Sequence, residues 1–456
     1  MSEEKENIQF ELTEELIVQV ELLISEKDDE ELQNLLNGFH YADVAEILDE
    51  LNLEDAVYVI KLLDSETTSD ILTELDEDIR EKVLKNLSAK EIAEEIEELD
   101  TDDAVDIISE LPQERQQEVI SSIEDEEHKA EITELLAYDE DTAGGLMAKE
   151  LVKVYETWSV AGCMRRIRGQ AKDVTRVHSI YVVDKEEKLI GRLSLKDLIT
   201  AKSEQKIAEI SNSNVDSVNV NDDVEDVAKV MQKYDLEAIP VVDDNKVLLG
   251  RITIDDIVDV MKEEAEKDYQ LAAGITSDVE HDDSILQLTR ARLPWLFLGL
   301  IGGVGAFLIM EGFQHAFSKY AVLFFFTPLI AAMAGNVGVQ SSAIIVQGLA
   351  NDDVKGSINN RLIKEMLLAA LNGLILAIFL FLFVWVTKGD VNTAFAISIS
   401  LVAVIIVAGL IGTFVPLFLD KRGIDPAIAT GPFITTSNDI FGILIYFWIA
   451  KMILGI

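Results

Sequence analysis

The sequence predicts a multidomain chain with an all-α N-terminal domain of helical repeats, an α/β domain built from a tandem module, a connecting helix and a five-span α-helical membrane domain. Three observations carry this prediction. A short helical pattern recurs between residues 42 and 124, a strand-and-helix segment occurs twice, and long apolar segments follow residue 292. A chain of 456 residues is also too long for one core and suggests about three domains.

Charge is distributed very unevenly along the chain. Residues 1–290 carry 76 Asp+Glu and 29 Lys+Arg, a net charge of −47, whereas residues 291–456 carry 8 and 9, a net charge of +1. An acidic surface repels phosphate, so this composition excludes a nucleic-acid partner and favours divalent cations as partners. The single cysteine, Cys163, leaves no intrachain disulfide and no cysteine-based zinc site. The start, MSEEKENIQF, lacks the basic and apolar regions of a signal peptide, so we expect the first half in the cytosol.

The N-terminal domain is predicted over residues 1–136. Its amphipathic helical units begin near residues 42, 54, 67, 79, 90, 102 and 115. Such short helices bury their apolar stripe only by stacking on neighbours, which predicts a helical solenoid. The acidic outward faces fit either a solvated surface or a place where cations are captured. The density of Asp102, Asp103 and Asp106 at one helix start makes cation capture a serious alternative.

A tandem module follows. The segment SIYVVDKEEKLIGRLSLKDLI at 179–199 aligns with AIPVVDDNKVLLGRITIDDIV at 238–258 at an offset of 59 residues. Each copy has a β-branched strand, an acidic turn, a second strand containing Gly-Arg, and a helix with a Ser or Thr cap. This duplication resembles a tandem pair of CBS modules, placed at 137–200 and 201–262.

The resemblance to CBS modules implies a regulatory sensor that can bind an adenine nucleotide such as ATP. The residues carried over are a Ser/Thr-x-x-Asp at the start of the last helix of each module, namely Ser194 with Asp197 and Thr253 with Asp256. The alternative is that both hydroxyls only cap helices and the pair serves as a dimerisation platform.

A connecting helix is predicted over residues 263–292, within a charged stretch that breaks near Gly274. Its acidic start, which includes Glu263 and Glu264, directly follows the second module. We therefore expect these carboxylates near the place where the soluble elements meet.

The membrane domain is predicted over residues 293–456. Five apolar segments lie near 293–313, 320–349, 364–387, 393–419 and 426–454, each long enough to cross about 30 Å of hydrocarbon. Basic residues such as Arg290, Arg361 and Lys421 fall on one side of the membrane if all five segments span it. That side is cytosolic by the positive-inside rule, so we expect the C-terminus outside a multi-pass protein of the cell membrane.

The last apolar segment contains one carboxylate, Asp439. A carboxylate at membrane depth costs on the order of 3 kcal/mol or more unless it faces a bundle interior, water or a cation. Thr435, Thr436 and Asn438 supply further oxygen ligands, a set that suits a hard cation such as magnesium or calcium. The alternative is a buried aspartate satisfied by hydroxyl groups at a helix end.

The second apolar segment is also unlike a lipid-facing helix. It carries Asn336 and Gln340 among small residues, in the run PLIAAMAGNVGVQSSAIIVQG. Small residues permit close helix contact, and polar ones need partners inside a bundle. We expect this face to lie against Asp439, although polar residues that only hold helices together are an alternative.

Pro328, Gly335, Asn336 and Gln340, with Asp439 in the last segment, resemble the MgtE family of magnesium channels and transporters. The resemblance covers essentially the whole chain and implies a homodimer in membrane lipid, with a pore along the twofold axis between the second and fifth spans. It makes Asp439 the pore site and Asp425 a second, recruiting carboxylate at the cytosolic entrance of the fifth span.

The resemblance also implies that the soluble region closes the pore when cytosolic magnesium is high. Carried onto this sequence, magnesium bridges Asp102 and Asp106 to Asp256 and Asp259. Further sensor carboxylates are expected at Glu225, Asp235, Glu263 and Glu264. Bridging ions favour the compact, closed state because they bind it better.

We therefore expect a magnesium-selective channel that mediates influx across the cell membrane, with Mg²⁺ as both substrate and regulator and with ATP as a further ligand of the CBS pair. A gradient-coupled secondary transporter of Mg²⁺, Co²⁺ or Mn²⁺ is the alternative, and it would use the same Asp439. A non-transporting receptor does not need Asn336 and Gln340. An enzyme is not expected, because the soluble part shows no nucleophile, metal cluster or phosphate-binding loop.

Overall fold

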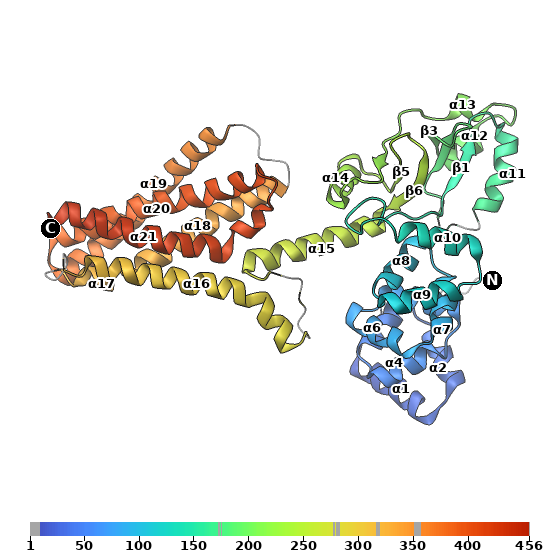
Figure 1. Cartoon of the computed structure of the whole chain (residues 1–456), viewed down its shortest axis with the longest axis horizontal. Coiled ribbons are helices and arrows are strands. Elements are labelled where there is room, and N and C mark those ends of the chain that lie inside the picture. Colours follow the sequence, from blue (N-terminus) through green and yellow to red (C-terminus); the bar gives the residue numbers. More distant parts are fainter. Residues whose placement is uncertain are drawn as a thin grey trace. The chain divides into compact units, whose positions relative to one another are not determined.

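The computed structural model describes residues 10–455 apart from 172, 173, 175, 277, 278, 280–282, 316–319 and 351–356 (Figure 1). Residues 1–9 of the predicted N domain and most of 277–282 in the predicted connecting helix thus lie outside the described residues. The chain forms two compact units, Met1–Met261 and Lys262–Ile456.

The N domain is a stack of short helices, coloured in blues and teal in Figure 1. Seven of them, α3 to α9, begin within two residues of the predicted starts, which confirms the helical repeat. Helices α1, α2 and α10 extend the stack beyond the repeats recognised in the sequence. The helices are α1 (Glu14–Glu26), α2 (Asp29–Leu36), α3 (Tyr41–Asp49), α4 (Leu53–Ile60), α5 (Ser65–Glu74), α6 (Glu77–Asn86), α7 (Ala89–Ile96), α8 (Thr101–Ser109), α9 (Gln113–Ser122) and α10 (Glu126–Leu135).

Short polar residues set these helix starts, and apolar residues hold the stack together. Asn52 and Ser88, for example, accept hydrogen bonds from backbone N–H groups of α4 and α7, as N-caps do. Within the repeat, several helices pack on the second one along the chain, α3 on α5, α4 on α6, α5 on α7 and α7 on α9. Their apolar stripes bury residues such as Leu48, Ile71 and Leu84.

Two three-stranded sheets form the tandem CBS pair. In each, the first strand is parallel to the second and the second antiparallel to the third. The register pairs Val182 with Gly191 in one sheet and Val241 with Gly250 in the other, as the 59-residue offset requires. The first module has β1 (Val152–Tyr155), α11 (Val160–Gln170), β2 (Ile180–Val183), β3 (Leu189–Leu193) and α12 (Leu195–Thr200); the second has α13 (Ile207–Ile210), β4 (Val218–Asn219), α14 (Val224–Tyr234), β5 (Ala238–Val242), β6 (Leu248–Thr253) and the start of α15 (Ile254–Ala273).

The linker that follows α10 joins the N domain to the second CBS module. Ala148 pairs with Arg251 of β6 through backbone hydrogen bonds of 2.8 and 2.9 Å. Met147 is fully buried in one apolar core that includes both the N domain and the second module. The first module has a separate core around β1, α11 and β2. The N domain is therefore docked mainly on the second module.

The membrane unit contains five helices long and apolar enough to cross a membrane, as predicted. They are α16 (Ile285–Phe313), α18 (Thr327–Ala350), α19 (Ile358–Lys388), α20 (Val391–Asp420) and α21 (Gly431–Leu454). A short helix α17 (Val322–Phe325) precedes α18, and the 3₁₀ helix η1 (Pro426–Ala429) precedes α21. The structure differs from the predicted connecting helix, because residues 263–273 continue α15 and residues 285–292 belong to α16.

Helix α20 is the most buried of the five and packs on α18, α19 and α21. Helix α21 also packs on α16 and α18. Glycines allow α18 and α20 to approach closely, because a Cβ on Gly412 of α20 would overlap the Gly338 carbonyl of α18. Close packing of α18 on α21 brings the polar residues of the second and fifth predicted spans together.

Candidate functional site

A groove between α18 and α21 contains the carboxylate of Asp439. Its volume is about 410 Å³, and Asn336 and Gln340 line it from α18. Thr435 and Asp439 line it from α21, one helical turn apart, with small residues such as Gly335 in its wall. Asn336 and Gln340 are exposed and Asp439 is partly exposed in the single chain. The predicted encounter of Asp439 with this face of the second span is thus present.

Two of the predicted pore residues point elsewhere. Thr436 packs against α16, where a Cβ on Gly302 would overlap its methyl group. Asn438 is buried against α18, and its Nδ2 donates a hydrogen bond to the Ala334 carbonyl oxygen at 3.3 Å. Both therefore position α21 and do not line the groove. Successive residues of a helix face different directions, so the run from 435 to 439 could not all reach one site.

Asp425 lies at the start of η1, just before α21. Its carboxylate accepts a hydrogen bond from the Ala427 backbone N–H at 2.8 Å and caps the 3₁₀ helix. The residue is exposed, at the start of the fifth span.

A second cluster of carboxylates lies where the N domain meets the second CBS module. Burial and the nearby Asp256 raise the pKa of Asp102, and the same causes raise the pKa of Asp103 to about 7. Burial and Glu150 raise the pKa of Asp100 to about 6. Burial also raises the pKa of Asp256. Several buried carboxyl groups are thus crowded together here, and Arg251 is a positive charge that pairs with one of them, Asp100.

The predicted sensor residues do not all belong to this cluster. Asp102 and Asp256 are close enough to interact, and Asp106 adds to the negative field around Asp103. Asp259 is exposed and lies about one helical turn beyond Asp256 on α15. Glu225 and Asp235 lie at opposite ends of α14, about 15 Å apart at 1.5 Å per residue, so they cannot share one ion. Glu263 and Glu264 belong to the part of α15 in the membrane unit.

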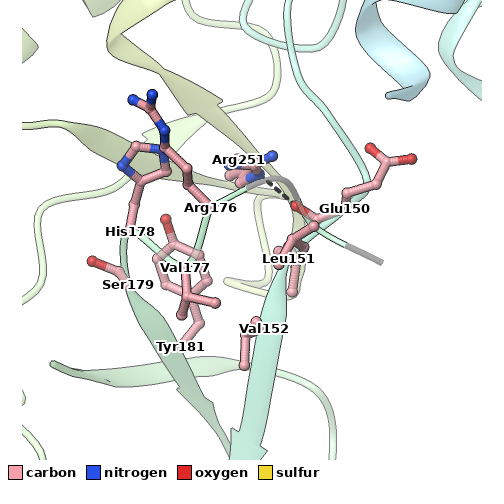
Figure 2. Close-up of a pocket in the computed structure, with 10 residues that line it drawn as sticks. Glu150, Leu151, Val152, Arg176, Val177, His178, Ser179, Tyr181 and Arg251 are labelled. Atoms are coloured by element: carbon pink, nitrogen blue, oxygen red, sulfur yellow. Dashed lines mark hydrogen bonds between the residues drawn. The ribbon is translucent and has the colours of Figure 1, made fainter. Parts of the chain in front are cut away.

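Sequence reasoning missed several members of the cluster. Asp100, Asp102 and Glu150 have carboxylate oxygens within 4.8 Å of one another. Asp100 precedes α8, but in place of capping it forms a 3.2 Å ion pair with the buried Arg251. Arg251 also donates from Nε to the Glu150 carbonyl oxygen (Figure 2). The signal available in the sequence was the acidic linker, YDEDTAGGLMAKE, which ends at Glu150.

The cavity beside Arg251 does not fit a nucleotide in this conformation. It is lined by Arg176, His178, Tyr181 and Arg251, and its volume is about 10 Å³, the space of a single water (Figure 2).

The Ser194 and Thr253 hydroxyls both serve helix starts. Ser194 Oγ donates to Asp197 at 2.6 Å and accepts from the Asp197 N–H at 3.1 Å. Thr253 Oγ1 donates to Asp256 at 2.8 Å. Ser194 therefore caps α12 as the capping interpretation expects. The Thr253 hydroxyl instead bonds the Asp256 carboxylate, which takes part in the acidic cluster as well.

An acidic solenoid, a tandem CBS pair and a five-helix membrane unit with a carboxylate-lined groove together define a multi-pass membrane protein of the cation-transport class. Family models agree with each part. The model for the MgtE intracellular N domain matches residues 39–141, the CBS domain model matches 143–204 and 207–263, and the MgtE model, described as a divalent cation transporter, matches 327–449. The chain belongs to the MgtE family.

Curated relatives extend over most of the chain. A magnesium transporter MgtE from Thermus thermophilus is 34% identical over 97% of this chain and 99% of its own length. The Enterococcus faecalis protein of the same name is 40% identical over 72% of each chain, and the Bacillus subtilis protein is 34% identical over 69% of this chain and 70% of its own length.

Solved structures resemble the soluble part. One is described as the cytosolic domain of the Mg²⁺ channel MgtE in complex with ATP; it is 35% identical, with a TM-score of 0.51, and covers 54% of this chain and 99% of its own. The soluble part of a magnesium transporter is 32% identical with a TM-score of 0.50, covering 55% and 99%.

Proposed function

We propose that this chain is a magnesium-selective channel of the cell membrane that mediates Mg²⁺ influx and is closed by Mg²⁺ bound to its acidic soluble domains. The observation that carries the proposal is the groove in which Asp439 faces the amides of Asn336 and Gln340. An oxygen-rich groove with one carboxylate suits a hard divalent cation. The names of the family relatives support magnesium as the cargo.

The groove has room for an ion that keeps its water. Mg²⁺ dehydrates reluctantly and retains several waters. Six waters occupy roughly 180 Å³ at about 30 Å³ each, well within the 410 Å³ of the groove. Asp439 would hold the hydrated ion through its waters. The side-chain amides of Asn336 and Gln340 would accept hydrogen bonds from these waters and donate hydrogen bonds to them. No fully dehydrated site is needed for conduction.

The exposed side of the groove supports a homodimer. Asn336 and Gln340 are exposed in one chain although they lie in an apolar helix, and polar groups facing lipid are costly. A second copy related by a twofold axis would cover them and place two Asp439 carboxylates across one path. In the cell membrane, the soluble half would lie in the cytosol and the C-terminus outside.

Gating would use the acidic cluster as its sensor. Without divalent ions, the carboxylates around Asp102 and Asp256 repel each other and weaken the docking of the N domain. Bound Mg²⁺ would offset this repulsion and stabilise the docked form. In the membrane unit, the end of α15 packs on the start of α21 through Ala272 and Gly431. Movement of α15 would therefore act directly on the helix that carries Asp439.

ATP is proposed as a further ligand of the CBS pair, since a cytosolic domain 35% identical to this chain was solved with ATP. Ser194, Asp197 and Thr253 would contact it after a change in the hydrogen bonds that Ser194 now makes with Asp197 and Thr253 with Asp256. A gradient-coupled transporter of Mg²⁺, Co²⁺ or Mn²⁺ is the second candidate, favoured by the same groove.

The test is Mg²⁺ flux into liposomes that contain the full chain, with Mg²⁺ varied on the side of the soluble domains. Asp439→Asn should abolish flux. Asp390→Asn is the matched control, because asparagine can replace Asp390 as the N-cap of α20 and flux should be unchanged. Normal flux in Asp439→Asn would sink the pore assignment. Ohmic current that ignores a proton gradient supports the channel, whereas flux that requires such a gradient supports the coupled transporter.

A further inference from the structure

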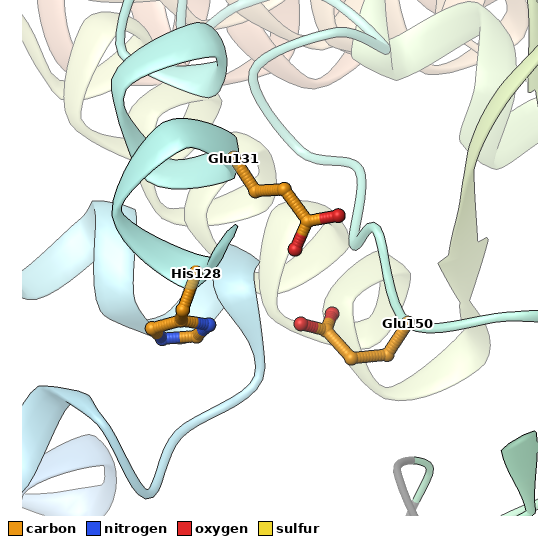
Figure 3. Close-up of side chains that lie close together, drawn as sticks. All are labelled: His128, Glu131 and Glu150. Carbon is orange, nitrogen blue, oxygen red and sulfur yellow. The ribbon is translucent and has the colours of Figure 1, made fainter. Parts of the chain in front are cut away.

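A mixed cluster of one imidazole and two carboxylates lies on the linker side of the N domain, beside the acidic cluster. Helix α10 supplies His128 and Glu131, and the linker supplies Glu150 (Figure 3). One ligand atom from each of the three lies within 4.8 Å of the others. All three side chains are partly buried. The spacing of three residues on α10 places His128 and Glu131 on the same helix face.

The hydrogen bond of His128 fixes which ring nitrogen can bind a metal. Its Nε2 lies 3.2 Å from the carbonyl oxygen of Ile96. A carbonyl oxygen only accepts, so in the neutral ring Nε2 carries the proton and Nδ1 holds the lone pair. In Figure 3 a ring nitrogen of His128 faces the two carboxylates. A carbonyl group that orients a histidine in this way is the usual outer partner of a metal-bound imidazole.

Hydrogen bonds also fix the position of Glu150. Its Oε2 accepts hydrogen bonds from the hydroxyl and the backbone N–H of Thr101, at 2.9 and 3.2 Å, so Oε1 can bind a cation. The neighbouring cation, Lys149, instead bonds Glu134 at 2.7 Å. The Glu131 and Glu150 carboxylates have oxygens within 4.8 Å of each other, and a bound cation would offset the repulsion between them.

We propose that His128, Glu131 and Glu150 form a binding site for a divalent transition metal ion of the zinc or cobalt type. An imidazole nitrogen with two carboxylates is a ligand set for such ions, whereas Mg²⁺ prefers oxygen ligands alone. The ion connects α10 to the linker. It binds Glu150, which is also a member of the acidic cluster. If the proposed gating holds, transition metals thereby tune the magnesium sensor.

The site is tested by binding, so its failure is separate from any failure of the proposed channel. Co²⁺ is titrated into the full chain in detergent with Mg²⁺ in large excess, and the visible absorption of bound Co²⁺ is followed. We expect binding that excess Mg²⁺ does not displace and that weakens at least tenfold in His128→Asn and in Glu131→Gln. His40→Asn is the matched control, because His40 caps α3 and asparagine is a good cap.

Equal Co²⁺ affinity in all variants, or displacement of Co²⁺ by Mg²⁺ ion for ion, overturns the proposal. A measurement on the unmodified chain guards against variants that misfold. X-ray absorption of the chain with one equivalent of Zn²⁺, again in excess Mg²⁺, should show one imidazole nitrogen at about 2.0–2.1 Å together with oxygen ligands. A shell with oxygen alone, or with several imidazoles, also overturns it.

Discussion

Thr101 and Glu150 are joined by two hydrogen bonds that connect the first turn of α8 to the end of the linker. The Thr101 hydroxyl donates to Oε2 at 2.9 Å and the backbone N–H donates to the same atom at 3.2 Å. The hydroxyl oxygen also accepts from the Lys149 N–H at 2.8 Å. Since Thr101 is fully buried, this hydroxyl is both a donor and an acceptor where water cannot replace it.

Replacing Thr101 with valine should therefore loosen the linker. The change keeps the shape but leaves the Lys149 N–H and the partly buried Glu150 carboxylate each short of a partner, at a cost of up to about 1–3 kcal/mol for each group. We expect the linker of the full-length variant to be cleaved by protease faster than that of the unmodified chain. We also expect the variant to need a higher Mg²⁺ concentration for protection from this cleavage. Thr133→Val, which removes an exposed hydroxyl bonded within α10, should behave like the unmodified chain. Equal cleavage rates for the two variants would contradict this role for Thr101.

The docking of the N domain should depend on pH. The pKa of Asp103 is raised to about 7 and that of Asp100 to about 6, from an ordinary value of 3.8. A carboxyl group with a raised pKa binds its proton more tightly in the docked state. Docking without Mg²⁺ is therefore favoured below pH 3.8 and is progressively weakened as pH rises through about 6 to 7.

Hydrogen exchange of the backbone amides of α8, corrected for the intrinsic effect of pH, measures this dependence. Without Mg²⁺ we expect greater protection at about pH 5.5 than at about pH 7.5, and added Mg²⁺ should matter mainly at the higher value. Asp103→Asn should reduce the difference, because its amide cannot ionise. Protection that rises with pH in the absence of Mg²⁺ would show that these carboxyl groups are stabilised as anions.

Gly338 sets the separation of α18 and α21. A Cβ at this position would overlap Nδ2 of Asn438 and lie 2.7 Å from Cγ2 of Ile434. Gly338→Ala should push the two helices apart, at a cost of about 1–3 kcal/mol, and distort the groove around Asp439. We expect Mg²⁺ flux to fall at least tenfold in liposomes.

Gly303→Ala on α16 is the control for this change, because nothing lies within 4 Å of a Cβ there. Its flux should match that of the unmodified chain. If Gly338→Ala conducts as well as Gly303→Ala, the close contact of α18 with α21 is not required for the path.

Local patterns predicted the elements of this fold well. The helical repeat, the 59-residue duplication and the apolar spans depend on neighbouring residues and on periodicity, so α3 to α9, the two sheets and the five long helices could be read from the sequence. Helices α1, α2 and α10 lack a clear place in the repeat. The connecting helix was predicted to begin at residue 263, but no Gly or Pro interrupts Ile254–Ala273, so the last helix of the second module continues through this boundary as α15.

The sites were harder to predict because they depend on contacts between distant residues. Asp439 could be predicted as a site residue, because a carboxylate in an apolar membrane helix is costly unless it has a partner or a function. Glu150 did not, since it is one of many acidic residues in the soluble half, and only the docking of the linker on β6 brings it to Asp100. Asn438 was placed in the pore by its sequence position, but helix rotation turns it into the contact with α18.

Gly431 offers a test of how α15 acts on the groove. It begins α21 with a φ of +43°, and a Cβ there would overlap the Ala272 carbonyl oxygen at the end of α15. Alanine at this position is strained by its backbone conformation and forces α15 away from α21. If contact between α15 and α21 closes the channel, Gly431→Ala should leave flux substantial at Mg²⁺ concentrations that shut the unmodified chain, measured in liposomes with Mg²⁺ on the soluble side.

The effect of strain can be separated from the effect of contact. Gly423 also has a positive φ, of +67°, but nothing lies within 4 Å of a Cβ there. Gly423→Ala therefore carries similar strain without displacing α15, and its inhibition by Mg²⁺ should be normal. Equal loss of inhibition in both variants would point to backbone strain near η1. Normal inhibition in Gly431→Ala would mean that closure does not pass through the contact of Ala272 with Gly431.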